Sequence, residues 1–287
     1  MFDCSSFRVE PGVKIDLPGM TADFTGPFKS KTEAKKHTQE NIEKMIELQS
    51  RLYAESAKAL LVVFQGMDAA GKDSAIRHVM SGLNPQGTSV HSFRQPSPEE
   101  LSHDYLWRYV KNLPEKGRIG IFNRSYYEEA LAVRVHQIAK ARRVPDTQAQ
   151  KDFWKERLHQ MRGFEKYLHT NGTIVVKFFL NLSKEEQKKR LIERLEDKTK
   201  NWNFSVDDMR EREFWDDYIR FYEEAIQETS TTWAPWYIVP SDKKWFSRLA
   251  VSEIVMQTLR DMKPEYPRLN REQLKIHKTM RERLLNT

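Results

Sequence analysis

The residues best suited to chemistry form one short segment, GMDAAGKD, at positions 66–73. Gly66 and Gly71 let the backbone curl so that its N–H groups point inward at a phosphate, and Lys72 supplies a positive charge for the outer phosphates. The pattern G-x-x-x-x-G-K between an apolar run and a helical pattern is typical of a phosphate-binding loop; the alternative is a glycine-rich turn with a surface lysine. The residues predicted to contact phosphate are Gly66, Ala69, Ala70, Gly71, Lys72 and Asp73.

Two aspartates make this loop unusual. Asp73 stands where serine or threonine normally offers a hydroxyl ligand to Mg²⁺, so a metal would be held differently or shared with another carboxylate. Asp68 lies inside the loop, where it would repel a phosphate unless a cation sat between them. We therefore predict that Asp68 ligates magnesium or assists the attacking oxygen. The alternative is an aspartate that stabilises the loop through backbone amides.

A second segment, FNRSYYEE at 122–129, follows another apolar run. Because ligands of open parallel sheets bind at the carboxyl ends of the strands, we expect this segment beside the loop. Arg124 can then grip a phosphate with its planar fork, and Glu128 can ligate magnesium. The alternatives are a salt bridge for Arg124 and a solvated helix face for the glutamates. The residues of this segment expected to contact a nucleotide are Asn123, Tyr127 and Glu129.

A basic helical segment begins at Ser183. Arg190, Arg194 and Lys198 recur every four residues and therefore share one helix face. Such a face can clamp a transferring phosphoryl group or guide a polyanion, and the alternative is a solvated face paired with neighbouring acids. The polar break at 198–204 separates two capped helices, which suits a hinged lid over 183–229.

The elements that must position these residues alternate along the chain. We predict buried strands at 59–65, 88–94, 118–123, 173–180 and 236–240, and helices at 31–57, 72–80, 97–112, 147–169 and 244–262, with further helices opening at 125, 183 and 205. This alternation favours an α/β fold with a five-stranded parallel sheet flanked by helices on both faces. Because no linker divides the chain, we expect one domain over 1–287, with an N-terminal arm and helix at 1–57 and a C-terminal tail at 264–287.

Composition narrows the class of protein. Of 287 residues, 39% are hydrophobic and 31% are charged, which excludes a disordered or fibrous chain. The net charge of +7 fits an anionic partner such as nucleic acid, nucleotide or polymeric phosphate, and equally fits an ordinary basic surface. A single cysteine, Cys4, cannot form an internal disulfide or a zinc site. Because no apolar run could span a membrane and the start lacks a secretory pattern, we expect a cytoplasmic protein.

Four segments together resemble the polyphosphate kinase 2 family: GMDAAGKD, FNRSYYEE, SKEEQKKRLIERLEDKTKNWNFS and TSTTWAPWYIVPSDKKW. They occur in the family's order, and the resemblance covers residues 31–259. It implies a thymidylate-kinase-like P-loop kinase fold with a helical lid. It also implies a homo-oligomer (a dimer or a tetramer) that transfers phosphoryl groups reversibly between inorganic polyphosphate and nucleotides with Mg²⁺, or with Mn²⁺ as a substitute.

Asn123 followed by a glutamate pair resembles the third class of this family, whose members convert AMP to ADP and ADP to ATP. The resemblance implies that Asp68 and Glu128 handle magnesium, while Lys72 and Arg124 contact phosphates. Many members have aspartate at position 123, and an amide is a poor Mg²⁺ ligand, so no metal role is expected for Asn123. The residues implied to line the lid over the polyphosphate channel are Arg190 and Arg194.

Two other functions remain open from the sequence. An ordinary nucleoside or nucleotide kinase that uses ATP as donor would have the same loop, although the dense basic helix favours a polymeric donor. A non-catalytic nucleotide-binding or nucleic-acid-binding module would use the basic helix alone. Nucleic acid is the weaker partner, because no RNA-binding or DNA-binding motif is present and aromatic residues do not alternate with the basic ones.

Overall fold

A computed structural model describes residues 2–138, 152–199, 201 and 205–286 of the chain. Its centre is a sheet of five parallel strands in the order β2-β3-β1-β4-β5. The strands are β1 (Ala59–Gln65), β2 (Thr88–Ser92), β3 (Ile119–Asn123), β4 (Thr173–Asn181) and β5 (Trp236–Pro240). This arrangement confirms the predicted α/β class and all five predicted strands.

Strand β1 lies in the middle of the sheet, and both of its faces are covered. All seven of its residues, ALLVVFQ, are buried, as are all five of β3. A parallel strand buried on both faces needs a continuous apolar run rather than an alternating one, which explains why the pattern was visible in the sequence. Strand β1 pairs with β3 on one side and with β4 on the other, so the segment that leaves β1 lies between the ends of its neighbours.

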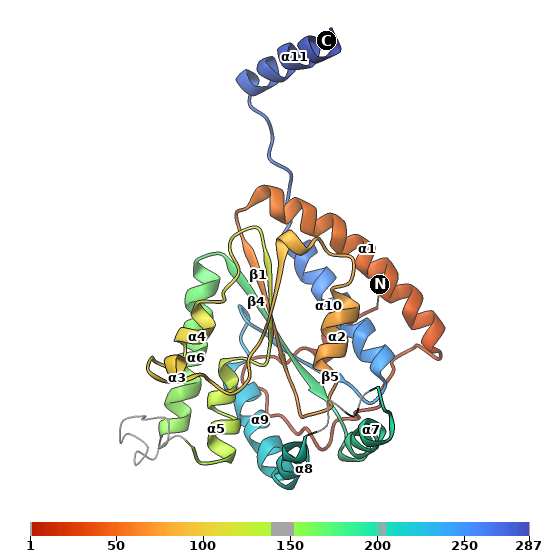
Figure 1. Ribbon diagram of the computed structural model, residues 1–287, viewed down its shortest axis with the longest axis vertical. Helices are drawn as coiled ribbons and strands as arrows, with labels where there is room; N and C mark the ends of the chain where they lie inside the picture. The colour runs from red at the N-terminus through yellow and green to blue at the C-terminus, as the bar shows by residue number, and fades with distance from the viewer. Residues whose placement is uncertain (1, 139–151, 200, 202–204, 287) are drawn as a thin grey trace.

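Helices cover the sheet in two layers (Figure 1). One face packs against α1 (Lys31–Glu55), α2 (Lys72–Val79) and α10 (Lys244–Asp261), and its core includes Leu60, Val62 and Phe64 of β1. The other face, with Leu61 and Val63, packs against longer helices and short segments near them. These elements are α4 (Trp107–Val110), the 3₁₀ helix η3 (Tyr126–Glu129), α6 (Phe153–Thr170) and α9 (Trp215–Thr229).

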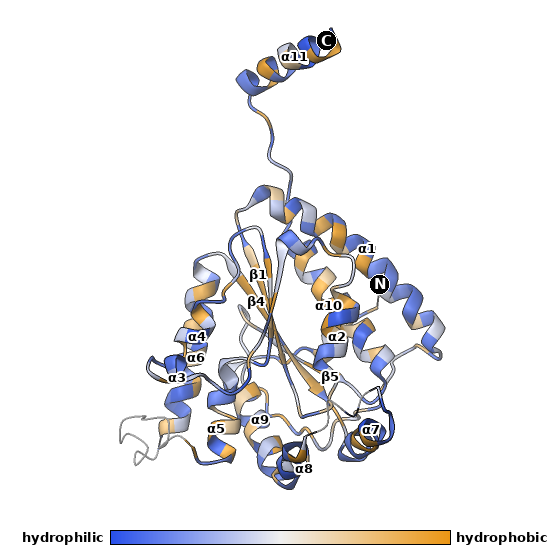
Figure 2. Cartoon of the chain, in the orientation of Figure 1, coloured by the Kyte–Doolittle hydropathy of each residue, from blue (hydrophilic) through white to orange (hydrophobic). Residues whose placement is uncertain are grey.

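The remaining elements lie outside these two layers. Helices α7 (Lys184–Glu196) and α8 (Val206–Glu213) lie near the end of the sheet where β4 finishes, and they are largely hydrophilic in Figure 2. Helix α11 (Arg271–Leu285) extends away from the rest of the chain in Figure 1. The other short elements are η1 (Ser5–Phe7), η2 (Pro85–Gly87), α3 (Pro98–Leu101) and α5 (Ala132–Val135). Among the described residues, no helix is long and apolar enough to cross a membrane.

Three predicted helices need correction. The helix expected over 97–112 is divided into α3 and α4, because the Asp104 carboxylate accepts the Leu106 N–H at 2.9 Å and turns the chain between them. The helix expected from 125 is instead the 3₁₀ helix η3 followed by α5. The helix from Ser205 is interrupted at Phe214, where α8 ends and α9 follows. The predicted start at 147 and most of the break at 198–204 lie outside the described residues.

Candidate active site

The phosphate-binding loop connects β1 to α2 through a backbone path that only a few residue types can follow. Gly66 has a φ of 149°, and a Cβ atom at this position would lie 3.0 Å from the Leu180 carbonyl oxygen. Gly71 has a φ of 101° and caps the N-terminus of α2. Ala69 adopts the left-handed region at 63°, which is strained for a residue with a side chain. The two glycines are therefore required by the path of the backbone.

Lys72 lies directly beneath this loop. Its side chain is 6% exposed, and Nζ donates hydrogen bonds to the carbonyls of Gly66 at 2.7 Å and Met67 at 3.2 Å. Burial lowers the Lys72 pKa to about 8, and the Arg124 charge adds to this effect against three nearby carboxylates. Those carboxylates belong to Asp68, Glu128 and Asp73. The ammonium group is therefore held at the loop by bonds that a phosphate can replace.

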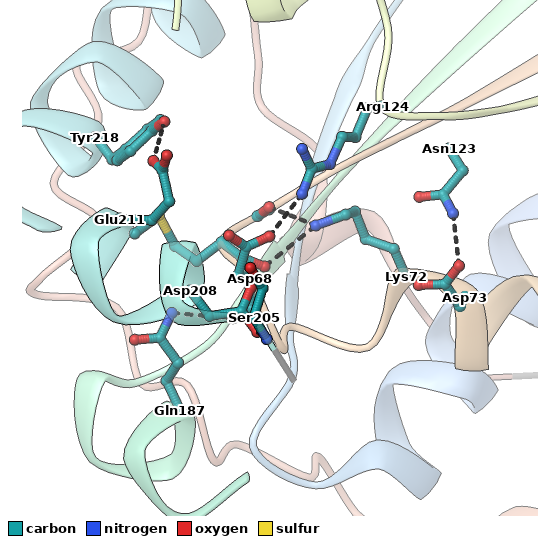
Figure 3. A network of polar contacts seen from close by, with 12 residues as sticks. Asp68, Lys72, Asp73, Asn123, Arg124, Gln187, Ser205, Asp208, Glu211 and Tyr218 are labelled. Atoms are coloured by element: carbon teal, nitrogen blue, oxygen red, sulfur yellow. Dashed lines mark hydrogen bonds and ion pairs between the residues drawn. The ribbon is translucent and has the colours of Figure 1, made fainter. Parts of the chain in front are cut away.

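Arg124 and Asp68 form an ion pair beside the Lys72 ammonium group (Figure 3), with Nη2 and Oδ1 2.6 Å apart. Arg124 follows β3 with a φ of 64°, and its backbone N–H donates to the Phe64 carbonyl at 3.0 Å. Although burial opposes it, the charges of Glu128 and Asp68 hold the Arg124 pKa above its ordinary value. The structure thus brings together the four residues predicted to be catalytic: Asp68, Lys72, Arg124 and Glu128.

The side chains of Asp73 and Asn123, the residues at two unusual positions, contact each other. The Asn123 side-chain amide donates to the Asp73 carboxylate at 2.9 Å and lies 3.4 Å from the Ser92 hydroxyl. An amide is a donor to a carboxylate, whereas a second carboxylate at 123 would repel the first. The Asn123 amide therefore gives the Asp73 carboxylate a hydrogen-bond donor that an aspartate at 123 would not supply.

Helix α8 supplies acidic residues that the sequence motifs did not mark. The Asp208 carboxylate on α8 accepts a hydrogen bond from Arg194 of α7 at 3.0 Å. Burial and the charge of Asp68 raise the Asp208 pKa, which places the α8 carboxylate in range of the loop. Glu211, one turn further along α8, accepts from the Tyr218 hydroxyl at 2.6 Å (Figure 3). Their spacing of three residues on one capped helix was the available signal.

Three side chains predicted to contact substrate are buried in the ligand-free protein. Tyr127 is fully buried, and its hydroxyl donates to the Glu165 carboxylate at 2.9 Å and lies 2.7 Å from the Thr229 hydroxyl. Glu129 is also buried, at 5% exposure. Arg190, expected over a polyphosphate channel, is 4% exposed and contacts backbone carbonyls instead. Of the three predicted nucleotide contacts, only Asn123 lies beside the loop.

The acidic residues present are compatible with a divalent cation. In the part of the chain that the structure describes, no cluster of three or more metal-ligating side chains occurs. Mg²⁺ usually takes only one or two carboxylates, with water and substrate phosphates completing its shell. Asp68 and Glu128 both lie close enough to Arg124 to shift its pKa, so two carboxylates lie near the same guanidinium. This donor set fits a cation that binds together with phosphate.

Three features of this site together define a P-loop phosphotransferase. They are a glycine-containing loop between the central strand and a helix, a lysine hydrogen-bonded to that loop, and an arginine from the adjacent strand. Comparison with known proteins gives the particular family. A family model described as Polyphosphate kinase 2 (PPK2) matches residues 28–267, and the chain belongs to this family.

Relatives of known name align along almost the whole chain. The ADP-polyphosphate phosphotransferase of Rhodopseudomonas palustris is 48% identical over 97% of each chain. The AMP/ADP-polyphosphate phosphotransferase of Meiothermus ruber is 42% identical over 91% of this chain and 94% of its own. The crystal structure of polyphosphate kinase 2 from Arthrobacter aurescens TC1 superposes with a TM-score of 0.86 at 36% identity, covering 96% of this chain and 95% of its own. The resemblance seen in the sequence is thereby confirmed.

Proposed function

We propose that the protein transfers the terminal phosphoryl group of inorganic polyphosphate to AMP and to ADP, giving ADP and ATP, and that the reaction is reversible. The observation that carries this proposal is the convergence of Lys72, Arg124, Asp68 and Glu128 at the loop. The names of the two sequence relatives, which act on ADP and on AMP and ADP, support the choice of acceptors.

The roles of the residues follow from their positions. The loop N–H groups and Lys72 hold the phosphoryl group that moves, and Arg124 neutralises the charge that develops on it. An oxygen of the nucleotide's terminal phosphate attacks phosphorus in line, and the bridging oxygen of the shortened polyphosphate leaves with the bonding electrons. No covalent enzyme intermediate is needed, because holding the two substrates in line removes most of the entropic barrier.

Asp68 and Glu128 would hold Mg²⁺, or Mn²⁺ as a substitute. Such a cation supplies charge neutralisation between the donor and acceptor phosphates. Arg124 contacts one oxygen of the Asp68 carboxylate, Oδ1, so the carboxylate could also hold a cation, and phosphate is a competing partner for the guanidinium. The Arg124–Asp68 pair is then the ligand-free arrangement, from which Arg124 could turn to a phosphate while Asp68 and Glu128 would hold the cation.

We also infer that residues 183–229 act as a lid, that the enzyme works as a homo-oligomer, and that it works in the cytoplasm with its nucleotide substrates. The Arg194–Asp208 ion pair between α7 and α8 supports the lid, because it connects the two helices across the break. Its side chains are 22% and 15% exposed, so it can be exchanged for a substrate contact. Light scattering on the purified protein measures the number of subunits.

Phosphorus NMR of the protein with magnesium, long-chain polyphosphate and AMP tests the reaction, beside a tube in which ATP replaces polyphosphate. We expect ADP and then ATP to form in the polyphosphate tube. A Lys72→Met variant prepared in the same way should be inactive, which excludes a contaminating kinase. Transfer in the ATP tube alone would make the protein an ordinary nucleotide kinase. Transfer in neither tube, with tight binding of short nucleic acids, would support a non-catalytic module.

A further inference from the structure

Helix α7 contacts the phosphate-binding loop from the outside through two buried side chains. Gln187 is 1% exposed, and its Nε2 donates to the Asp68 carbonyl at 3.0 Å. One turn further along, Arg190 Nη1 donates to the carbonyls of Ala69 at 2.9 Å and Ala70 at 3.2 Å. Three successive loop carbonyls therefore point toward α7.

Arg190 has no donor left for a substrate. Its Nη2 donates to the carbonyls of Ser241 at 2.6 Å and Asp242 at 3.0 Å, and its Nε donates to Glu186 at 3.0 Å. Together with the two loop carbonyls, these contacts use all five N–H groups of the guanidinium. The planar fork of arginine suits this task, because one flat group reaches two separate stretches of backbone.

The direction of these carbonyls decides what the loop presents to a ligand. A peptide unit is planar and trans, so its C=O and N–H bonds point in opposite directions. Holding the carbonyls of Asp68 and Ala70 toward α7 turns the N–H groups of Ala69 and Gly71 to the opposite side. It also keeps partially negative oxygens away from the space where a phosphate would bind.

The same contacts connect the loop to the second lid helix. Arg212 of α8 donates from Nη1 to the Gln187 Oε1 atom at 2.8 Å and to the Lys184 carbonyl, also at 2.8 Å. The Gln187 amide thus receives a hydrogen bond from α8 and gives one to the loop. A movement of α8 that withdraws Arg212 would release one end of this amide.

We propose that Gln187 and Arg190 are positioning residues that fix the peptide orientation of the phosphate-binding loop, and that Arg212 makes this orientation depend on the position of α8. Arg190 acts here on the backbone of the enzyme and not on the substrate. The identity of the ligand rests on the proposed function, whereas the orientation of the loop belongs to the ligand-free protein.

Two measurements on Arg190 variants test the proposal. Hydrogen–deuterium exchange reports the loop of the ligand-free protein, and calorimetry gives the affinity for tripolyphosphate at several salt concentrations. For Arg190→Gln we expect faster exchange in the loop, affinity weaker by roughly 10- to 100-fold, and an unchanged dependence of affinity on salt. Arg190→Lys keeps the charge but cannot reach four carbonyls, so it should restore neither property. Lys189→Gln, an exposed charge loss on the same helix, is the matched control.

Direct contact between Arg190 and polyphosphate predicts the opposite results. Loop exchange would then match the wild type, the salt dependence would fall by roughly one charge, and Arg190→Lys would recover most of the affinity. That combination would overturn the proposal. Should the Arg190 variants fail to fold, Gln187→Glu and Arg212→Gln provide the milder test, and wild-type loop exchange in both would overturn it equally. Altered loop exchange in a protein without polyphosphate-dependent transfer would refute the proposed function and leave the positioning role intact.

Discussion

Two ion pairs of equal length occur in the described part of this chain, and their surroundings differ completely. Arg124 and Asp68 approach to 2.6 Å with side chains that are 42% and 21% exposed. Lys177 and Glu165 also approach to 2.6 Å, with side chains that are 0% exposed. Distance alone does not distinguish a pair that serves chemistry from one that serves the fold. Exposure and the remaining hydrogen-bonding capacity do.

We call the Lys177–Glu165 pair closed, because every proton of its ammonium group is bound within the protein. Besides Glu165, Lys177 Nζ donates to the Tyr127 hydroxyl at 3.0 Å and to the Thr229 carbonyl at 2.8 Å, which uses its three protons. Glu165 in turn accepts from the Tyr126 hydroxyl at 2.7 Å. Burial lowers the pKa of Lys177 to about 8, and the Glu165 charge opposes this shift. Every proton of the ammonium group has a protein partner, so nothing remains for a ligand.

We call the Arg124–Asp68 pair open, because both side chains are partly exposed. It depends on the closed pair for its position. Tyr126 and Tyr127, which anchor η3 to the buried pair, lie between Arg124 and Glu128 in the chain. Two phenol hydroxyls therefore fix the segment that carries one cation and one carboxylate of the site. The partly exposed Arg124–Asp68 pair is therefore held in position by the buried Lys177–Glu165 pair, through the η3 segment.

Removing one carboxylate from the open pair should give the largest effect on activity. Asp68→Asn is expected to lower turnover by roughly 10²- to 10³-fold, because it removes a proposed metal ligand and the counter-charge of Arg124. The free energy of unfolding should change by no more than about 1 kcal/mol, since the pair is partly exposed. Initial rates over a magnesium titration, together with urea unfolding, measure both.

Asp207→Asn is the control for this variant, because Asp207 is an exposed carboxylate on α8. It should leave both turnover and stability at wild-type values. If Asp68→Asn keeps its turnover and its magnesium dependence, the metal assignment is wrong and the open pair is merely structural.

Breaking the closed pair should have the opposite effect, a large loss of stability with little loss of turnover. Glu165→Gln leaves the Lys177 ammonium buried without a counter-charge, at an expected loss of about 3–5 kcal/mol in the free energy of unfolding. Turnover per folded molecule should remain within about threefold of wild type at low temperature, a change equivalent to well under 1 kcal/mol. Urea unfolding and active-site-normalised rates make the comparison.

The double variant Glu165→Gln with Lys177→Met tests the cause. Removing both charges should recover at least half of the lost stability, because a neutral pair has no charge to desolvate. A Glu165→Gln protein that is stable but inactive would place the buried pair inside the active site and remove the distinction between the two regions.

The framework of the site was predictable from the sequence because it depends on local patterns. Continuous apolar runs gave the strands, and Gly66 and Gly71 marked the loop where the backbone requires them. Arg124 and Glu128 followed from their place after a buried strand. Each of these predictions needs only the residue types and their order along one element.

The parts that the sequence did not reveal depend on contacts between elements. Arg190 looked like a member of a basic stripe, but its side chain turns inward to carbonyls from two other segments. Tyr127 lay inside a motif rich in functional residues, and its burial depends on Glu165, 38 positions away. Lys177, alone within the apolar run TIVVKFFL, was a visible irregularity in β4, and its partner could not be identified without the fold.

A pH series sharpens the comparison through the two lysines, because burial lowers the pKa of both to about 8. Phosphate binds the charged form of Lys72, so its affinity is fully present below pH 8 and is lost as the ammonium deprotonates above it. The dissociation constant of tripolyphosphate should rise about tenfold between pH 7 and pH 9 through this group alone. Calorimetry at fixed ionic strength measures it.

The Lys72→Arg variant separates the titration of Lys72 from that of tripolyphosphate itself. The arginine stays charged throughout this range, so the affinity of this variant should depend less on pH. The neutral double variant at positions 165 and 177 should follow the wild-type curve, because Lys177 has all of its protons bound within the protein and does not face the ligand. Identical curves for wild type and Lys72→Arg would show that Lys72 does not titrate on binding. A flattened curve in the double variant would mean that the closed pair responds to the ligand after all. In that second case, exposure and spare bonding capacity would no longer suffice to tell the two ion pairs apart.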